Sequence, residues 1–304
     1  MKIERILCPT DFSEASAHAI DQAVAIAGWY KARITALHVV LPSVPPLPGR
    51  PASTDITARA EGDLEQLRKE TAARFAAAAR AGIGLDVMIE VGWPARCILE
   101  RAADLQADLI VIGTHGTSGF EHLVLGSVAE KVLRKAKCPV VTVPPRAQAI
   151  SRLPFNRLLC AVDFSDSSLT ALRSALSLAK ESSAALTVLH VLEWPWDEPP
   201  PPRLEELPAE QGLALAEYRR YCEKRAMARL ESLVPDSEGT SHPPVSRLRN
   251  GKPYVQILDV AAEEKSDLIV LGVRGRQPLD TTFFGSTANQ LVRHAKCPVL
   301  TLRQ

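Results

Sequence analysis

The residues from 113 to 127, GTHGTSGFEHLVLGS, combine glycines and a hydroxyl group in a spacing that could bind a phosphate. Two glycines stand three residues apart and a Gly-Ser pair follows after nine more residues, at Gly113, Gly116, Gly126 and Ser127. Glycine lets a backbone approach a phosphate closely because it has no Cβ, and the N–H groups at a helix start attract anions. A purely structural interpretation is also open, since Ser127 and Glu130 match the Ser-x-x-Glu capping box that stabilises a helix N-terminus.

A second copy of this stretch favours the ligand-binding interpretation. Residues 272 to 286, GVRGRQPLDTTFFGS, keep the same spacing while most intervening residues differ, and the retained positions are Gly272, Gly275, Gly285 and Ser286. The capping partner is lost, because Asn289 stands where Glu130 stood. Arg274 adds positive charge to the second loop, and His115, at the matching position of the first, could contact phosphate or be exposed. We therefore predict two phosphate-binding loops.

The duplication extends over the whole chain of 304 residues. RILCPTDFSEAS at 5–16 recurs as RLLCAVDFSDSS at 157–168, and the segments 91–143 and 250–302 share 22 identities in 53 positions without a gap. Such self-similarity indicates a tandem duplication. The sequence thus predicts two domains, 1–146 and 152–304, with a short insertion in the second copy that is most simply placed in the Pro-rich stretch 193–208.

Each domain alternates short β-branched runs with longer amphipathic segments, which is typical of βαβ units around a parallel sheet. The runs DLIVI and DLIVL lack polar alternation, as expected for central strands covered on both faces. Strands are predicted near 3–9, 33–40, 85–91, 107–113, 139–143, 157–162, 185–191, 245–250, 267–272 and 298–302. Helices are predicted near 14–28, 58–81, 95–105, 127–136, 166–181, 205–233, 254–264 and 286–295. Both glycine loops then follow a buried strand, at the sheet edge where open α/β sheets bind ligands.

The bulk composition argues against several classes of function. The 36 basic and 35 acidic residues leave a formal net charge of +1, so we expect no nucleic-acid partner and no anionic membrane surface. The six cysteines include no Cys-x-x-Cys pair and most stand in apolar runs, as expected for small core residues. The N-terminal MKIERILCPTDF lacks the apolar core of a signal peptide, and no run of about 18 apolar residues exists, so we expect a cytoplasmic protein.

The Gly-x2-Gly-x9-Gly-Ser spacing after a buried strand resembles the nucleotide-binding signature of the universal stress protein family, and CPTDFSEAS resembles that family's first strand and turn. The likeness covers both domains. It implies a Rossmann-like (adenine nucleotide alpha hydrolase-like) α/β fold in each, with a five-stranded parallel sheet of order 3-2-1-4-5 flanked by helices. It also implies that the last strands, 138–143 and 297–302, pair within one chain as a pseudo-dimer. A further homodimer of the whole chain stays open.

The resemblance further implies an ATP site in each domain. The adenine would lie by Pro9, Thr10, Asp11 and Val39 in the first domain, and by Ala161, Val162, Asp163 and Val191 in the second. Ribose and phosphates would meet Ile112, Gly113, Gly116, Gly126, Ser127 and Val128, and in the second domain Leu271, Gly272, Gly275, Gly285, Ser286 and Thr287. The second domain departs from the family pattern at Ala161–Val162 and at Val273–Arg274, so nucleotide binding is better supported in the first.

Some of these residues have structural alternatives. Asp11 and Asp163 could cap the first helix of their domains, although Ser13 and Ser165 are better placed for that role. His38 and His190 end apolar strands, and we expect them to be hydrogen-bonded structural residues rather than ligands.

The sequence favours a binding protein over an enzyme. It contains neither the Gly-x4-Gly-Lys-[Ser/Thr] loop nor the Gly-x-Ser-x-Gly elbow, and phosphoryl transfer generally needs a metal clamp that no motif here supplies. The leading interpretation is a stress-response protein that binds ATP, with or without Mg²⁺ or Mn²⁺, and acts through conformation or interactions. The alternatives are a regulatory scaffold that binds no nucleotide and a slow ATP hydrolase or phosphotransferase.

Overall fold

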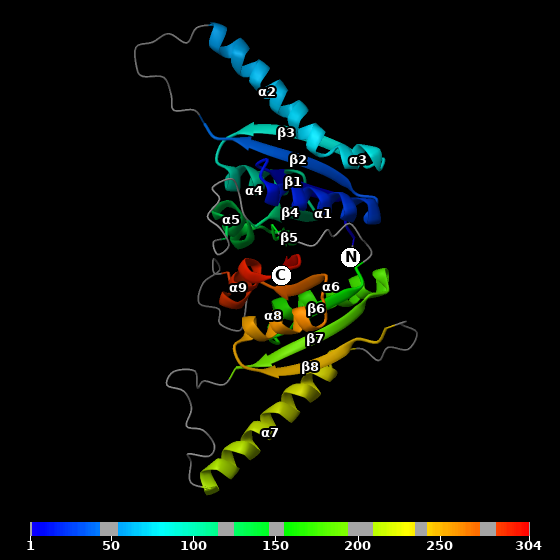
Figure 1. The fold of residues 1–304 in the computed structure, drawn as a ribbon, viewed down its shortest axis with the longest axis vertical. Coiled ribbons are helices and arrows are strands. Elements are labelled where there is room, and N and C mark those ends of the chain that lie inside the picture. Colours follow the sequence, from blue (N-terminus) through cyan, green and yellow to red (C-terminus); the bar gives the residue numbers. More distant parts are fainter. Residues whose placement is uncertain are drawn as a thin grey trace, which may run out of the picture.

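The strands of both domains join into one continuous sheet (Figure 1). The computed structural model describes residues 2–42, 54–114, 125–145, 155–193, 209–234, 242–273 and 284–303. The strands are β1 (Arg5–Thr10), β2 (Arg33–Val40), β3 (Leu85–Val91), β4 (Leu109–Gly113), β5 (Val140–Val143), β6 (Arg157–Ala161), β7 (Ala185–Leu192), β8 (Val245–Asn250), β9 (Leu268–Gly272) and β10 (Val299–Leu302). Their order across the sheet is β3-β2-β1-β4-β5-β10-β9-β6-β7-β8.

Within each domain the five strands are parallel and follow the predicted order. The order reverses between β1 and β4 in the first domain and between β6 and β9 in the second. The predicted central strand DLIV is buried in both copies, from Leu109 to Val111 and from Leu268 to Val270. Parallel strands end at the same edge of a sheet, so each reversal point opens a crevice at that edge.

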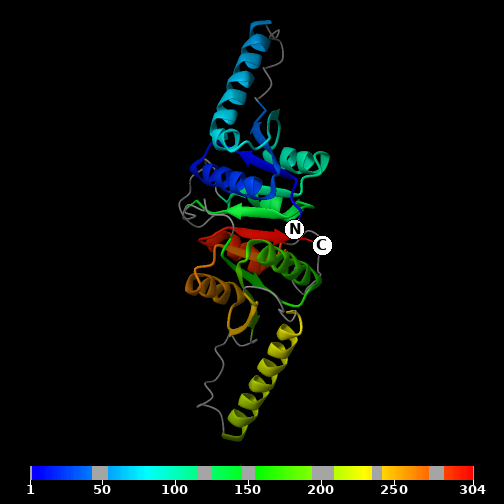
Figure 2. The same cartoon turned by 90° about the vertical axis from the view of Figure 1, so that its right-hand side faces the viewer.

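The two domains meet through their last strands, β5 and β10, which pair antiparallel. The register sets Val140 opposite Thr301 and Thr142 opposite Val299. Each threonine hydroxyl donates across the joint, Thr142 to the carbonyl of Val299 at 3.3 Å and Thr301 to that of Val140 at 3.1 Å. Figure 2 shows the two strands side by side at the centre of the molecule. The predicted contact between the last strands is thus present, over slightly shorter segments than predicted.

Helices cover both faces of the sheet and bury two apolar cores. One face carries α1 (Glu14–Tyr30), α2 (Thr54–Arg74), α3 (Ala76–Arg80), α6 (Asp166–Ser182) and α7 (Ala209–Glu231), and the other carries α4 (Pro94–Asp104), α5 (Ser127–Lys135), α8 (Pro253–Glu263) and α9 (Ser286–His294). Both cores draw residues from both domains, so apolar packing continues across the joint. Among the described residues, no helix has the length and apolarity needed to cross a membrane.

The helix predicted over 58–81 is wrong as a single element, because the chain bends between α2 and α3. Phe75 stands at the bend with φ −92° and ψ 17°, and its side chain is fully buried. Alanine-rich sequence on both sides of Phe75 favours helix, so the sequence pattern does not indicate the bend. The bend places the Phe75 ring in the core. In the second domain α7 runs unbroken to Glu231, with the buried Leu230 close to its end.

Side chains add bonds between the domains on both faces of the joint. The Tyr30 hydroxyl at the end of α1 donates to Glu181 Oε2 near the end of α6 at 2.7 Å. On the other face Arg303, just after β10, donates to the carbonyl oxygens of Leu133 and Arg134 in the last turn of α5. A cation is favourable at a helix C-terminus, where the carbonyl groups lack helical partners.

Candidate functional site

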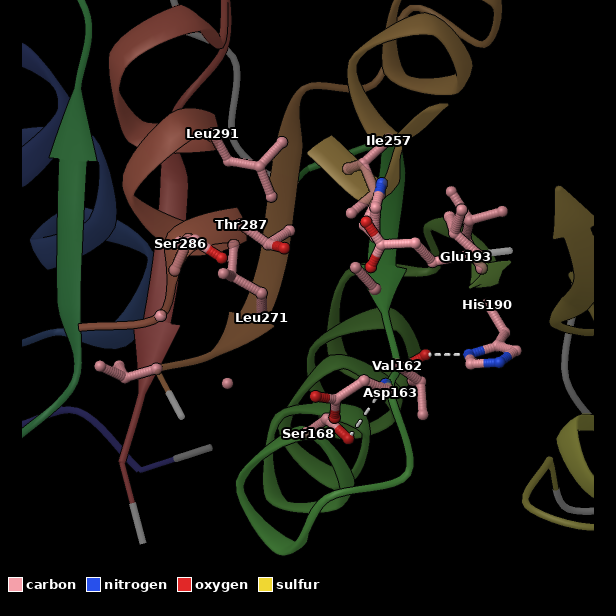
Figure 3. Close-up of a pocket in the computed structure, with 18 of the residues that line it drawn as sticks. Val162, Asp163, Ser168, His190, Glu193, Ile257, Leu271, Ser286, Thr287 and Leu291 are labelled. Carbon is pink, nitrogen blue, oxygen red and sulfur yellow. Dashed lines mark hydrogen bonds between the residues drawn. The ribbon is translucent and has the colours of Figure 1, made fainter. Parts of the chain in front are cut away.

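Each domain has a cavity at the point where its strand order reverses, of about 540 Å³ in the first domain and about 420 Å³ in the second. The walls are the carboxyl ends of the first, second and fourth strands of the domain and the first turn of the helix that follows the glycine loop. Figure 3 shows the second cavity, with Ser286 and Thr287 on α9 facing Val162 and Asp163 after β6.

The cavities bring together the predicted site residues of each domain that lie in the described part of the chain. The first is lined by Pro9, Thr10, Asp11, Val39, Ile112, Gly113, Gly126, Ser127 and Val128. The second is lined by Ala161, Val162, Asp163, Val191, Leu271, Gly272, Gly285, Ser286 and Thr287. The remaining predicted residues, His115, Gly116, Arg274 and Gly275, lie outside the described residues.

Several lining residues were missed by the sequence interpretation. They include Pro94 and Ile98 on α4, with Pro253 and Ile257 at the matching positions of α8. A signal was available, because both pairs are identical between the two copies. The same residues also suit an ordinary helix start, with proline in the first turn and an isoleucine one turn later, so the pattern alone does not indicate a site.

The start of α5 differs from the capping-box alternative. Gly126 is the N-cap with no side-chain cap bond, and Ser127 is the first helical residue. Glu130 lies instead 3.9 Å from Arg134, one turn along the helix. The second domain repeats this arrangement with Gly285 as the uncapped N-cap of α9. The capping box is therefore wrong, and both serines line a cavity beside N–H groups that have no partner within the helix.

Gly113 and Gly272 have a packing role that the sequence interpretation did not include. A Cβ at Gly113 would lie 2.9 Å from the carbonyl oxygen of Ala15, and a Cβ at Gly272 would lie 2.6 Å from the carbonyl carbon of Ser167. Both contacts are with backbone at the start of α1 and α6. The glycines thus allow the first helix of each domain to approach the end of the fourth strand, which closes the floor of the cavity.

The turn after the first strand is fixed by a hydrogen-bonded serine network. Asp11 Oδ1 accepts from the Ser13 hydroxyl at 2.6 Å and from its N–H at 3.1 Å, while the Ser13 hydroxyl oxygen accepts from the N–H of Ser16 at 3.2 Å. Asp163 and Ser165 repeat these bonds in the second domain. The serines are the N-caps, as predicted, and the aspartates orient them.

The two histidines are hydrogen-bonded as expected, and both also line the cavities. Nδ1 of His38 lies 2.8 Å from the carbonyl oxygen of Thr10, and Nδ1 of His190 lies 2.7 Å from that of Val162. Because a carbonyl oxygen only accepts, Nδ1 carries the proton in each bond. Figure 3 shows the bond from His190 to the strand end that carries Asp163.

The rims of the cavities differ in charge. Leu41 lines the first cavity and is 57% exposed, whereas Glu193 occupies the matching position of the second. Figure 3 shows Glu193 reaching into the second cavity from the end of β7. Trp93, which is 67% exposed, precedes the lining residue Pro94, and Lys252 stands in its place in the second domain. The first rim is thus apolar and the second is charged.

The cysteines near the sites are core residues, as expected. Cys8 and Cys160 are fully buried in the first strands, and burial raises the pKa of both thiols, that of Cys160 to about 12. Neither thiol is ionised near neutral pH. Within the described residues, no group of three His, Cys, Asp or Glu side chains is arranged to hold a metal ion.

The comparisons with known proteins agree with this architecture. The model of the universal stress protein family matches residues 2–144 and again 154–303. A universal stress protein of Mycolicibacterium smegmatis is 28% identical over 302 residues, which cover 98% of this chain and 96% of that protein. Universal stress protein MJ0531 of Methanocaldococcus jannaschii is 36% identical over 140 residues, covering 46% of this chain and 81% of that protein.

Among solved structures, a universal stress protein from Archaeoglobus fulgidus matches with a TM-score of 0.64 at 23% identity and covers 100% of this chain and 99% of that one. At this identity the match supports the fold. The two family matches, each spanning one copy of the cavity described above, decide the family. The chain belongs to the universal stress protein family, and it contains that family's domain twice.

Proposed function

We propose that each domain binds one adenine nucleotide, with ATP as the ligand, and that the protein acts in stress responses through its nucleotide-bound conformation rather than through turnover. The main support is that both domains form the same cavity from matching residue positions. In each domain the helix at the cavity begins without a side-chain cap. Both volumes fall in the usual range for small-ligand pockets, roughly 300–1,000 Å³.

The walls suit the separate parts of a nucleotide. Leu37 and Val39 offer an apolar surface for the base, and Asp11 lies beside them at the end of β1. The hydroxyl of Ser127 and the first N–H groups of α5 offer donors and the positive end of a helix dipole for the phosphates. A Mg²⁺ or Mn²⁺ ion would arrive with the phosphates, since the described residues include no preformed cluster of three metal-binding side chains.

Replacement of Ser127 by alanine tests the phosphate end of this site. We expect Ser127→Ala to weaken ATP binding by roughly ten- to a hundredfold, the loss of one hydrogen bond to a charged group, with little change in stability because Ser127 is not the N-cap. Isothermal titration calorimetry and urea denaturation provide the two measurements. The matched control is Ser13→Ala, which removes a true N-cap and should lower the free energy of unfolding by about 1 kcal/mol.

Folded wild-type protein that binds no ATP in equilibrium dialysis would contradict the proposal and leave the regulatory scaffold as the better interpretation. Steady release of phosphate from bound ATP over many turnovers would instead favour a hydrolase. Equal ATP affinity in Ser127→Ala and wild type would show that the Ser127 hydroxyl at the start of α5 does not bind the phosphates.

The carboxylate of Glu193 on the rim predicts that the second cavity binds ATP more weakly than the first. We expect Glu193→Leu to raise ATP affinity there by about two- to fivefold, because an exposed carboxylate near a polyanion costs roughly 0.5–1 kcal/mol. The reciprocal change, Leu41→Glu, should lower affinity in the first cavity by a similar factor. Both effects should shrink in titrations at 0.5 M salt, because screening weakens exposed charges. Salt-independent changes would argue against this electrostatic origin.

We also propose that the antiparallel joint makes the two domains one intramolecular pseudo-dimer, in which neither half is an independent unit. The shared cores and the bonds from Tyr30 and Arg303 support this.

A further inference from the structure

A group of one arginine, one phenylalanine and one histidine, called a stack below, lies behind each cavity, with nearly parallel rings in the first domain and tilted rings in the second. In the first domain the Phe12 ring lies on the His38 ring with centroids 4.2 Å apart and planes at 12°, and Arg74 Cζ lies over the Phe12 ring, 4.7 Å from its centroid. In the second domain the Phe164 and His190 rings are tilted by 46° with centroids 4.4 Å apart, and Arg229 Cζ lies 4.2 Å from the Phe164 centroid. Each stack joins the long helix of its domain to a residue that lines the cavity.

The phenylalanine at the centre of each stack has a backbone conformation that it adopts at a cost. Phe12 and Phe164 have φ of 64° and 65°, in the left-handed region that bulky side chains avoid. Such residues persist where the surrounding structure holds them, and they concentrate at ligand sites. Here each follows directly after the cavity aspartate, so the strained turn sets where Asp11 and Asp163 lie.

The arginine supplies the outer part of the restraint. Arg74 on α2 also donates from Nη1 to the carbonyl oxygen of Phe12 at 3.2 Å, so it holds both the ring and the backbone of the turn. On the inner side, His38 donates to the carbonyl of Thr10, the residue two before Phe12. The turn is thus held between a helix and a strand end.

Both domains place an arginine over the phenylalanine, although the helices that carry the two arginines differ. The segments that form α2 and α7 differ in sequence and length, and α2 is followed by α3 whereas α7 ends at Glu231. Yet Ala-Arg-Phe at 73–75 and Ala-Arg-Leu at 228–230 both place an arginine over the phenylalanine and a fully buried apolar residue next to it.

We propose that Arg74 and Arg229 are positioning residues for the two nucleotide cavities, which act through Phe12 and Phe164 on the turns that carry Asp11 and Asp163. The inference rests on the proposed nucleotide function and deepens it. Through these arginines, α2 and α7 are connected to the turns that line the cavities. The two helices project at opposite ends of the molecule (Figures 1 and 2).

The test compares two arginines of the same helix. Arg74→Met keeps the apolar stem and removes the charge, and Arg68→Met makes the same change where the guanidinium bonds the carbonyl of Val87 instead. We expect Arg74→Met to weaken ATP binding in the first cavity about fivefold in two-site calorimetric titrations, with cavities assigned by Ser127→Ala and Ser286→Ala. Arg68→Met should bind ATP within twofold of wild type, and Arg74→Lys should restore most of the loss because the cation over the ring is kept.

A second measurement needs no ligand. Hydrogen exchange of a peptide spanning residues 9–16 reports the N–H groups of Phe12 and Ser13, which donate to Thr10 Oγ1 and Asp11 Oδ1. Exchange there should be at least threefold faster in Arg74→Met than in Arg68→Met or wild type. Unchanged exchange, or faster exchange with unchanged ATP affinity, overturns the positioning role. Wild-type protein that binds no ATP overturns the proposed function instead, while the exchange result still decides whether Arg74 holds the turn.

Discussion

Gly272→Ala should lower the free energy of unfolding by about 3 kcal/mol and abolish nucleotide binding in the second cavity. The added Cβ would lie 2.6 Å from the carbonyl carbon of Ser167 and 2.7 Å from the N atom of Ser168. Both are backbone atoms at the start of α6, so the clash is relieved only by moving the helix away from β9. Overpacking a rigid site typically costs about 1–3 kcal/mol, and a backbone contact falls at the upper end. Urea denaturation and ATP titration measure the two effects.

Two further glycines calibrate this result. Gly113→Ala should be milder than Gly272→Ala, because its closest contact is 2.9 Å, from the carbonyl oxygen of Ala15. Gly28→Ala is the matched control within α1, where the new Cβ would meet only Ile83 Cδ1 at 3.8 Å. There the change should stabilise the protein by about 0.5–1 kcal/mol through helix propensity. Similar losses at Gly28 and Gly272 would show that the tight helix–strand contact is not the cause.

Val141→Pro should split the unfolding of the protein into two steps. Val141 lies in β5 between β4 and β10, is 3% exposed and stands opposite Leu300 across the joint. Proline removes a ladder donor from a central strand, a position where proline is essentially not found. We expect one calorimetric transition for wild type, because both cores cross the joint, and two separated transitions for the variant.

The control for this variant is Val245→Pro, at the first residue of the edge strand β8 and 54% exposed. Proline is tolerated at the start of an edge strand, so the single transition should be kept. Two transitions in wild type itself would contradict the pseudo-dimer, since they would show that the domains unfold independently.

Most of the architecture was predictable because the chain repeats its own pattern. The buried runs DLIVI and DLIVL define the fourth strands without any alignment to other proteins, and the resemblance then supplied the strand order. Ser13 and Ser165 were recognisable as caps because their hydroxyls stand three residues before the N–H groups that they accept from. These features depend on local spacing, which a sequence shows directly.

The features that were missed depend on contacts between distant segments. The glycines at 113 and 272 match a phosphate loop by spacing, but their tight contacts are with α1 and α6, which lie about one hundred residues earlier in the chain. The positive φ of Phe12 has no local signature, since glycine or asparagine is the usual residue in that region. The capping box was a misleading local signal, because Gly126 is the N-cap and Ser127 is already the first helical residue.

The antiparallel joint also determines where the sheet stops growing. It uses one edge of each domain, so β3 and β8 are the two outer strands of the sheet. Both carry charged side chains in ion pairs: Asp86 of β3 lies 2.9 Å from Arg33, and Arg249 of β8 lies 2.6 Å from Glu263. Charged edge strands resist pairing with the strands of other molecules. The uncharged edge strands β5 and β10 pair with each other inside the chain, and only the charged strands β3 and β8 remain at the outer edges. The sheet is therefore not expected to extend into fibres by pairing with other molecules.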